Sequence, residues 1–503
     1  MKNSTLNWGH ALAVIISLFP IGCNPDKDLP PLVYEVPERI EPYIERFKKE
    51  GEFRGVMPNM DYLKVEFVEE IQFNDSSNVI GLCIRSRNGA HTIQLDTGSL
   101  WWHLGDLAIE EIIFHELGHC FLARPHDDEV LANEDFASIM RTKGPVLYAH
   151  NPDFRYENSF KRDYYLDELF YGTAEEPCWV SNTPNPNLKV TTFTRKDFNG
   201  TASSIPENII TDRYGNTWFY AFDRFCKYLG GNSFEKIELP VLEGDDQTSW
   251  IHDVYNDQAG NIWISMNIWN NGKRTFKLNE AGNFELMFVD STFQLSDTPY
   301  ELYIVDESQV FFNSFNSFGI IDLVTNSMVN FKNEELGIEL KNYFPIKIVG
   351  HPNGKVYFSK GEHFFSYEKE TGVRRITNGG SNKLKGGINE LIINDLGDVW
   401  MRVNREVVQF QESTNSFMQL DRVSANLLHS IIYQIGFDRE NNLWVATNYG
   451  LKKFDHQQER FSGYCDYYFG ADPEKLNRFG FDLENNIWVR ESRSIHRLEA
   501  GTN

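Results

Sequence analysis

The segment His115-Glu116-Leu117-Gly118-His119 holds the residues with the clearest potential for chemistry. Positions four apart on a helix differ by about 40° in direction and by ~6 Å in height. Two imidazoles at this spacing can therefore bind one metal ion from the same helix face, and zinc is the ion that this pattern favours. Glu116 follows the first histidine, where it can take a proton from a metal-bound water. The segment predicts a hydrolytic zinc site with Glu116 as the catalytic base.

A third protein ligand is expected soon after this helix, because catalytic zinc sites use three ligands and leave a fourth position for water. We expect His126 to be that ligand, in the turn that begins at Arg124 and Pro125. Two neighbouring carboxylates, Asp127 and Asp128, are the close alternatives. The predicted metal ligands are therefore His115, His119 and His126.

The run Ser138-Ile139-Met140 follows the third histidine. With the helical HExxH it resembles the metzincin clan of zinc peptidases, whose signature ends in a methionine turn often written Ser-Ile-Met. The resemblance implies a zincin-like fold, bound Zn²⁺ and a peptide substrate. It also implies that Met140 lies under the metal as a packing floor, and that substrate lies along an edge strand, for which residues 91–95 are the candidate.

Two features differ from the metzincin pattern. Leu122 occupies the position of the signature's glycine, and His126 comes one residue later than the clan's third histidine. A later carboxylate such as Glu134 in place of His126 would make the site gluzincin-like.

The surrounding periodicity predicts the elements that position this site. Apolar residues at helical or alternating spacing indicate an α+β domain. Helices are expected at residues 40–50, 107–122 and 164–171, and short strands at 63–68, 79–85 and 91–95.

The second half of the chain contains a repeat. Its template is an Asp, a few variable residues, Gly-Asn or Asn-Asn, an apolar residue and an aromatic one, and the copies recur about every 45 residues. Gly and Asn supply the positive φ that a tight hairpin needs. The copies end at Trp218, Trp263, Phe311, Tyr357, Trp400, Trp444 and Trp488.

Four short strands in ~45 residues make one propeller blade, so seven copies predict a seven-bladed β-propeller. The last copy lacks a fourth strand, and residues 189–195 could supply it and close the ring. These repeats resemble the two-component-regulator propeller repeats of periplasmic sensor regions. The repeated aromatics are expected to pack between blades.

The N-terminus predicts export. A basic residue, Lys2, precedes a short apolar run at residues 11–19, which is too short to span a bilayer. Gly22-Cys23 resembles the lipobox of bacterial lipoproteins, with Pro20 where that pattern prefers Leu. The resemblance implies lipidation of Cys23 and a membrane partner through that anchor; the alternative is plain secretion.

Composition narrows the classes of function. The 503 residues carry a net charge of -24, which argues against nucleic acid as a partner. An aromatic content of 14% excludes a disordered chain. Six cysteines are too few for a disulfide scaffold, and their pairing cannot be read from the sequence.

The predicted fold class is multidomain: an α+β zincin-like metallopeptidase domain followed by an all-β seven-bladed propeller. The expected divisions are a lipoprotein signal peptide, a tether, the zinc domain, a linker and the propeller, at residues 1–22, 23–30, 31–172, 173–187 and 188–503.

The expected function is that of an envelope-anchored zinc metallopeptidase, a hydrolase, located in the bacterial cell envelope as an outer-membrane lipoprotein. Its partners would be a peptide or protein substrate and a glycan or protein ligand of the propeller. The alternative is a non-catalytic binding or sensing lipoprotein in which the zinc domain is vestigial.

Overall fold

The computed structural model describes residues between 30 and 500. Residues outside the description are 1–29, 74–75, 99–102, 104, 144–146, 149–157, 199–204, 241–248, 258, 269–271, 290–300, 306–307, 314–316, 339–345, 377–383, 385, 423–424, 428–429, 472–474, 477 and 501–503. Cys23, the expected lipidation site, therefore lies outside the described residues, as do the signal peptide and most of the tether.

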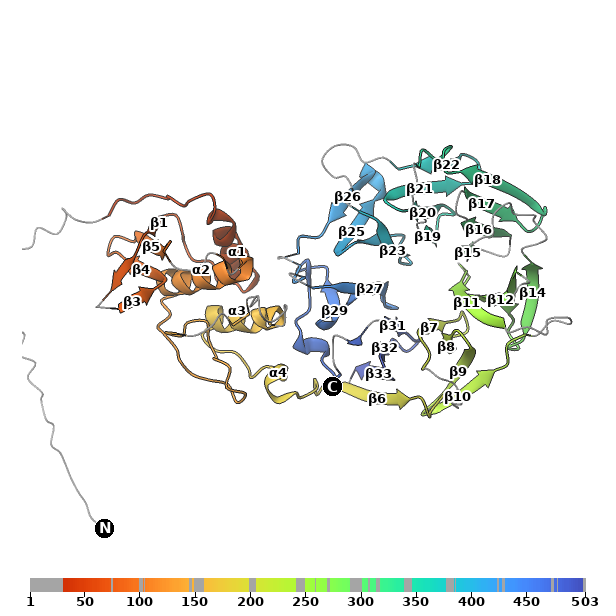
Figure 1. The fold of residues 1–503 in the computed structure, drawn as a ribbon, viewed down its shortest axis with the longest axis horizontal. Coiled ribbons are helices and arrows are strands. Elements are labelled where there is room, and N and C mark those ends of the chain that lie inside the picture. Colours follow the sequence, from red (N-terminus) through yellow and green to blue (C-terminus); the bar gives the residue numbers. More distant parts are fainter. Residues whose placement is uncertain are drawn as a thin grey trace, which may run out of the picture.

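The N-terminal unit combines helices with a small sheet (Figure 1). Its helices are α1 (Glu41–Phe53), α2 (Asp106–Phe121), η2 (Ser159–Lys161) and α3 (Arg162–Tyr171). Its strands are β1 (Leu63–Val68), β2 (Ile71–Phe73), β3 (Ser76–Val79), β4 (Gly81–Arg85) and β5 (His91–Asp96). The expected helices and strands are present within a few residues, except that the expected strand at 79–85 is divided between β3 and β4.

The strand order of the three-stranded sheet is β1-β5-β4. β1 pairs with β5 in parallel, and β4 pairs with β5 antiparallel. The expectation that residues 91–95 form the edge strand is therefore wrong, because β5 is central and β4 is at the edge. Strand order depends on contacts between distant segments, and strand patterning alone does not determine it.

One apolar core joins these elements. The inward faces of α1, α2 and α3 contribute Phe47, Phe114 and Leu169, which are all fully buried. A disulfide between Cys83 in β4 and Cys120 in α2 also fastens the helix to the edge strand. The two cysteines are 37 residues apart, and no local spacing marks them as a pair.

The rest of the chain forms a β-propeller of seven four-stranded antiparallel sheets within the described residues. Figure 1 shows them as a ring, with the first strand of each blade toward the middle and the fourth toward the rim. Blades one to three are β7–β10 (Asn208–Thr211, Thr217–Ala221, Arg224–Gly230, Ser233–Ile237), β11–β14 (Ser249–Asn256, Ile262–Ile268, Gly272–Leu278, Phe284–Val289) and β15–β18 (Glu301–Ile304, Gln309–Asn313, Ser317–Asp322, Ser327–Lys332).

Blades four to six follow the same order. They are β19–β22 (Ile346–Gly350, Val356–Lys360, His363–Glu368, Gly372–Arg375), β23–β26 (Ile388–Ile393, Val399–Val403, Glu406–Gln411, Ser416–Gln419) and β27–β30 (Ile432–Phe437, Leu443–Thr447, Gly450–Asp455, Arg460–Phe461). Short 3₁₀ helices η4 (Glu412–Thr414) and η5 (Cys465–Tyr467) lie in blade five and after blade six.

Blade seven closes the ring with strands from both ends of the propeller. It consists of β31 (Arg478–Phe481), β32 (Ile487–Glu491), β33 (Ser494–Ala500) and β6 (Leu188–Thr194). β6 pairs antiparallel with β33 along its whole length, from Leu188 opposite Ala500 to Thr194 opposite Ser494. The predicted closing strand is confirmed.

The repeated aromatics pack between blades, as predicted. Each of the seven apolar clusters in the ring joins two neighbouring blades. Trp488 of blade seven, for example, stacks on Phe193 of β6 and contacts Phe219 of blade one.

The template aspartate has a structural role in four of the blades. Its carboxylate accepts hydrogen bonds from the Asn of the turn and from the indole N–H of the Trp six residues later. These Asp–Trp pairs are Asp212–Trp218, Asp257–Trp263, Asp438–Trp444 and Asp482–Trp488, at 2.8–3.0 Å. Each buried indole N–H is thus satisfied by the turn that precedes it.

A basic side chain lies over each of these four Trp rings from the opposite strand. The four are Lys227, Lys277, Lys453 and Arg497. In the fifth copy Asn394 replaces the aspartate, and Gln409 lies opposite Trp400. Carboxylate and cation are therefore present together or absent together around these five Trp residues.

The N-terminal unit is fastened to blade six. After α3 the chain passes through α4 (Cys178–Ser181), and a disulfide joins Cys178 to Cys465 in η5. Phe160 of η2 packs against Tyr449 and Tyr464 of blade six. Of the described cysteines, Cys226 alone is free, and it is buried.

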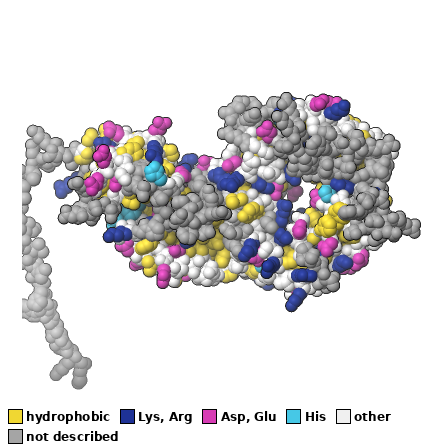
Figure 2. Space-filling model, in the orientation of Figure 1, with side chains coloured by type: hydrophobic (Ala, Val, Ile, Leu, Met, Phe, Trp, Pro, Cys, Tyr) yellow, Lys and Arg dark blue, Asp and Glu magenta, His cyan; other side chains and the backbone are white. Residues whose placement is uncertain are grey.

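Two further properties concern the surface. Acidic and basic side chains are interspersed on the face drawn in Figure 2, so the negative charge does not gather in one patch there. Among the described helices, none combines the length and the apolar character that a membrane crossing requires.

Candidate metal centre

Helix α2 brings His115 and His119 together on one face. Their Nε2 atoms lie 3.1 Å apart. Each Nδ1 faces a backbone carbonyl, that of Ile139 for His115 and that of Arg124 for His119, both at 2.6 Å. A carbonyl only accepts, so each Nδ1 carries the proton and donates it, which leaves both Nε2 lone pairs free for a metal.

The turn after α2 delivers His126 to the same point. The helix ends at Phe121, and Ala123 takes a left-handed φ of 55°, which reverses the chain. The N–H of Arg124 donates to the carbonyl of Gly118 and closes the helix end. The left-handed residue thus comes one position after Leu122, where the metzincin pattern has its glycine, and the third histidine is displaced by one position as well.

Each histidine offers one ligand atom, and these atoms all lie within 4.8 Å of one another. Of the described His, Cys, Asp and Glu residues, these three form the group able to hold a metal. The donor set is chemically suited to zinc, which binds neutral imidazole nitrogens. Burial also favours the neutral form: it lowers the pKa of His115 to about 3 and lowers that of His119.

The alternative carboxylate ligands are engaged or lie elsewhere. Asp128 accepts hydrogen bonds from the backbone N–H and the hydroxyl of Thr142. Asp127 accepts from the N–H of Glu129, and its own N–H donates to the carbonyl of Met140. None of these carboxylates, nor Glu134, belongs to the three-residue group.

The run Ser138-Ile139-Met140 supports the histidines from below. The Ser138 hydroxyl accepts the N–H of Met140 at 3.0 Å, which tightens the turn. Met140 is fully buried, and its sulfur lies 2.8 Å from where a Cβ on Gly118 would be. Residue 118 of the helix must therefore be Gly for the methionine to reach the helix between the two histidines.

Glu116 lies against the edge strand. It is 5% exposed, and burial raises its pKa to about 8 despite a hydrogen bond from the Cys83 N–H, which lowers it. A Cβ on Gly81 would lie 2.5 Å from Glu116 Oε1, so only glycine leaves room for the carboxylate. In this structure, the Glu116 carboxylate is held between α2 and β4.

Sequence reasoning missed the residues that brace the turn from α3. Glu168 accepts hydrogen bonds from Arg124 and, at 2.5 Å, from Ser138. The Arg124 guanidinium also donates to the carbonyl of Glu168 at 2.6 Å. Glu168 thus holds both the turn that carries His126 and the methionine turn. No local motif marks it, because it lies 30 residues beyond Ser138.

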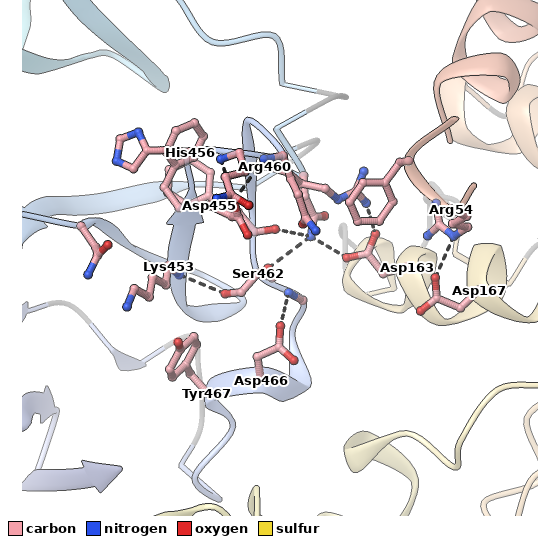
Figure 3. Close-up of a pocket in the computed structure, with 18 residues that line it drawn as sticks. Arg54, Asp163, Asp167, Lys453, Asp455, His456, Arg460, Ser462, Asp466 and Tyr467 are labelled. Carbon is pink, nitrogen blue, oxygen red and sulfur yellow. Dashed lines mark hydrogen bonds and ion pairs between the residues drawn. The ribbon is translucent and has the colours of Figure 1, made fainter. Parts of the chain in front are cut away.

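A separate pocket of about 790 Å³ lies between the N-terminal unit and blade six (Figure 3). Figure 3 shows Arg54 and Asp167 on one side, and Lys453, Asp455 and His456 on the other. None of the three clustered histidines lines it. Its wall contains the ion pair of Arg460 with Asp163, which joins the two parts of the chain. We assign the candidate chemistry to the histidine cluster and not to this pocket.

No known family model matches the sequence, and none of the curated proteins compared with it is similar enough to count as a relative. Solved β-propeller structures align with 62–64% of the chain. Streptogramin B lyase is 13% identical with a TM-score of 0.46 over 98% of its own length. The extracellular domain of a hybrid two-component system from B. thetaiotaomicron is 16% identical with a TM-score of 0.45 over 42% of its own length. YCF48 bound to D1 peptide is 12% identical with a TM-score of 0.44 over 97% of its length.

Proposed function

We propose that this chain is an exported zinc metallopeptidase whose propeller binds the substrate or a protein or glycan partner. The observation that carries the proposal is the cluster of His115, His119 and His126. Two Nε2 lone pairs are already directed to one point by carbonyls behind the rings. To gather three imidazoles around one point costs free energy, and within the described residues no other side chain occupies that point to offset the cost. A bound metal ion would offset it.

Zn²⁺ held by these ligands would polarise the scissile carbonyl and acidify a water molecule. Glu116 would be the base that accepts a proton from such a water and later gives it to the leaving amine. It adjoins the first ligand and is surrounded by protein, which limits competing exchange with solvent. Met140 holds the histidine pair in place from below through Gly118.

An extended peptide can be held along the outer edge of β4, which pairs with no further strand among the described residues. The hydrogen bonds that flank the β4–β5 pair, Asp96 N–H to Ile80 O and Ser86 N–H to Ala90 O, show that even-numbered residues of β4 face β5. The backbone groups of Gly81, Cys83 and Arg85 therefore face outward. Added strands at such an edge gain main-chain hydrogen bonds, and Glu116 is bonded at that same edge.

We base the proposed metzincin assignment on two features, the methionine turn and the helix that carries two of the histidines. The proposed domain divisions are the zinc domain at residues 31–172 and the propeller at residues 188–503.

We also propose that the protein is located in the cell envelope. The two disulfides support this location, because disulfides form in oxidising compartments. We further propose that a lipid on Cys23 anchors the protein to the membrane. Loss of labelling by radioactive palmitate in Cys23→Ser, with the protein released to the medium, is the expected result.

One observation favours the second candidate function, a binding protein with a vestigial zinc domain. The Glu116 carboxylate is bonded to β4 and is almost wholly buried, so one of its acceptor positions is used by the fold. In that case the propeller alone carries the function, as a module for a protein or glycan ligand.

The deciding experiment uses the purified protein with zinc. We expect close to one zinc per chain, cleavage within a broad peptide library, and loss of cleavage in Glu116→Gln with zinc content unchanged. Glu134→Gln, an exposed residue outside the cluster, is the matched control and should keep full activity. Bound zinc without any cleavage would favour the binding protein.

A further inference from the structure

Alternation along β4 places positions 81, 83 and 85 on the face of the sheet that α2 covers. Cys83 reaches α2 through its disulfide with Cys120, and Gly81 lies under Glu116 on the same face. Successive side chains of a strand point to opposite faces. Arg85, two residues after Cys83, therefore also extends its side chain on the α2 side of the sheet.

The two elements run side by side, so the position of Arg85 along the helix can be estimated. Gly81 is level with Glu116 and Cys83 with Cys120, and two strand residues cover about as much length as four helical ones. Arg85 is then level with the turn just beyond Phe121, where α2 has ended. This is the turn that carries His126.

Within the described residues, the Arg85 guanidinium takes part in no ion pair. Arg85 is exposed, and among the described residues the structure records no carboxylate partner for it. Its neighbour across the sheet is His91, which offers no negative charge; burial, and after it the Arg85 charge, lowers the pKa of His91. Most other arginines of this unit are engaged: Arg46, Arg54, Arg124 and Arg162 all have carboxylate partners.

The backbone around Arg85 faces the free edge. A peptide added there would place one residue directly opposite Arg85, with its side chain on the same face of the sheet. Side chains at such cross-strand positions contact each other, and opposite charges attract. Cys83, in the middle of this edge, already donates its N–H to Glu116, the proposed catalytic residue.

We propose that Arg85 is a specificity-determining residue that selects peptides with an Asp or Glu side chain close to the scissile bond. This inference rests on the proposed peptidase function and deepens it by naming the substrate class. Arg85 binds the acidic side chain and takes no part in the bond-breaking step, so its effect falls on KM and not on kcat.

The experiment uses quenched fluorescent peptides that differ in one residue, Glu, Gln or Lys, placed in turn at each position flanking one cleaved bond. With zinc-loaded wild-type protein, we expect one position at which Glu is preferred to Gln by roughly tenfold in kcat/KM, the ratio given by about 1.4 kcal/mol. Arg85→Gln should abolish this preference through KM, and Arg85→Glu should transfer it to Lys. The matched control, Arg87→Gln, removes the same charge from the exposed turn after β4.

Three outcomes separate the two claims. Equal cleavage of the Glu and Gln peptides at every position would overturn the role of Arg85 while the peptidase function stands. Cleavage of none of the peptides would count against the peptidase function. In that event, fluorescence anisotropy of the same peptides tests Arg85 directly, and equal binding of Glu and Gln peptides to the zinc-loaded protein would overturn its role.

Discussion

Arg460 of the propeller lies 3.2 Å from Glu50 of helix α1, measured from Nη1 to Oε2, although 410 residues separate them in sequence. Both side chains are buried. The same arginine donates to Asp163 in α3 at 2.6 Å, while Glu50 also accepts from Arg54 and Arg162. Arg162 continues the network to Glu110 of α2 at 2.6 Å. Helix α2, which carries two of the three proposed metal ligands, is thus linked by charges to blade six.

The network predicts a specific loss of stability in Arg460→Ala. Removal of Arg460 takes from Asp163 its ion-pair partner and from Glu50 one of its three guanidiniums, and breaking a buried ion pair costs about 3–5 kcal/mol. Thermal unfolding followed by circular dichroism should show a clearly lower Tm. Lys189→Ala, which breaks an exposed pair with Glu499, serves as the matched control and should change Tm little. Equal Tm values for the two variants would contradict the proposed role of the network.

The same network predicts a dependence on pH. Burial alone would raise the pKa of Glu50, but the guanidiniums of Arg162, Arg460 and Arg54 outweigh it and lower the pKa to about 2 from 4.5. A lowered folded-state pKa stabilises the fold fully above pH 4.5, and this stabilisation is lost as pH falls toward 2. Urea unfolding between pH 7 and 3 should show the decline, with a shallower slope in Glu50→Gln. A slope unchanged by that substitution would assign the decline to other carboxylates.

His126→Ala should weaken zinc binding more than a hundredfold, because loss of a residue behind a ligand already costs about 10–100-fold. Zinc content after dialysis against a chelator series is the measurement. Asp128→Asn, which changes a neighbouring side chain bonded to Thr142, is the matched control and should retain zinc. If His126→Ala kept its zinc and Asp127→Asn lost it, the third ligand would be the carboxylate.

Phe193→Ala should destabilise the propeller by about 3–5 kcal/mol, because the ring is fully buried and stacks on Trp488 across the closing sheet. The denaturant midpoint of the intact protein is the readout. Phe222→Ala provides the control, since that ring is 58% exposed on another blade. Equal midpoints for the two variants would show that closure of the ring does not depend on this contact.

The features that the sequence could predict are local. The spacing of His115 and His119 is enough to place both side chains on one helix face. A β-hairpin likewise depends on short-range sequence, because it consists of a turn and the two strands next to it. Seven copies of one hairpin pattern therefore predict the propeller. Ring closure by β6 could also be predicted, because the last repeat has only three strands and its blade needs a fourth.

The features that it could not predict depend on contacts across the fold. The pairing of Cys83 with Cys120 and the braces from Glu168 join segments without a shared motif. The edge position of β4 follows from strand order, which the pattern of each strand does not encode. For Arg85, no motif in the sequence marks the residue, and the face on which it lies became clear only from the disulfide at Cys83.

The pairing of β6 with β33 also determines when the propeller can close during synthesis. Lys189 and Glu499, which meet across this pair, are 310 residues apart. At roughly 5–20 residues per second, the ribosome finishes β33 on the order of 15–60 s after β6. During that interval β6 lacks its only partner strand, and the ring stays open. A chain in this state has not completed its propeller, so late closure of the ring is compatible with the export that we propose.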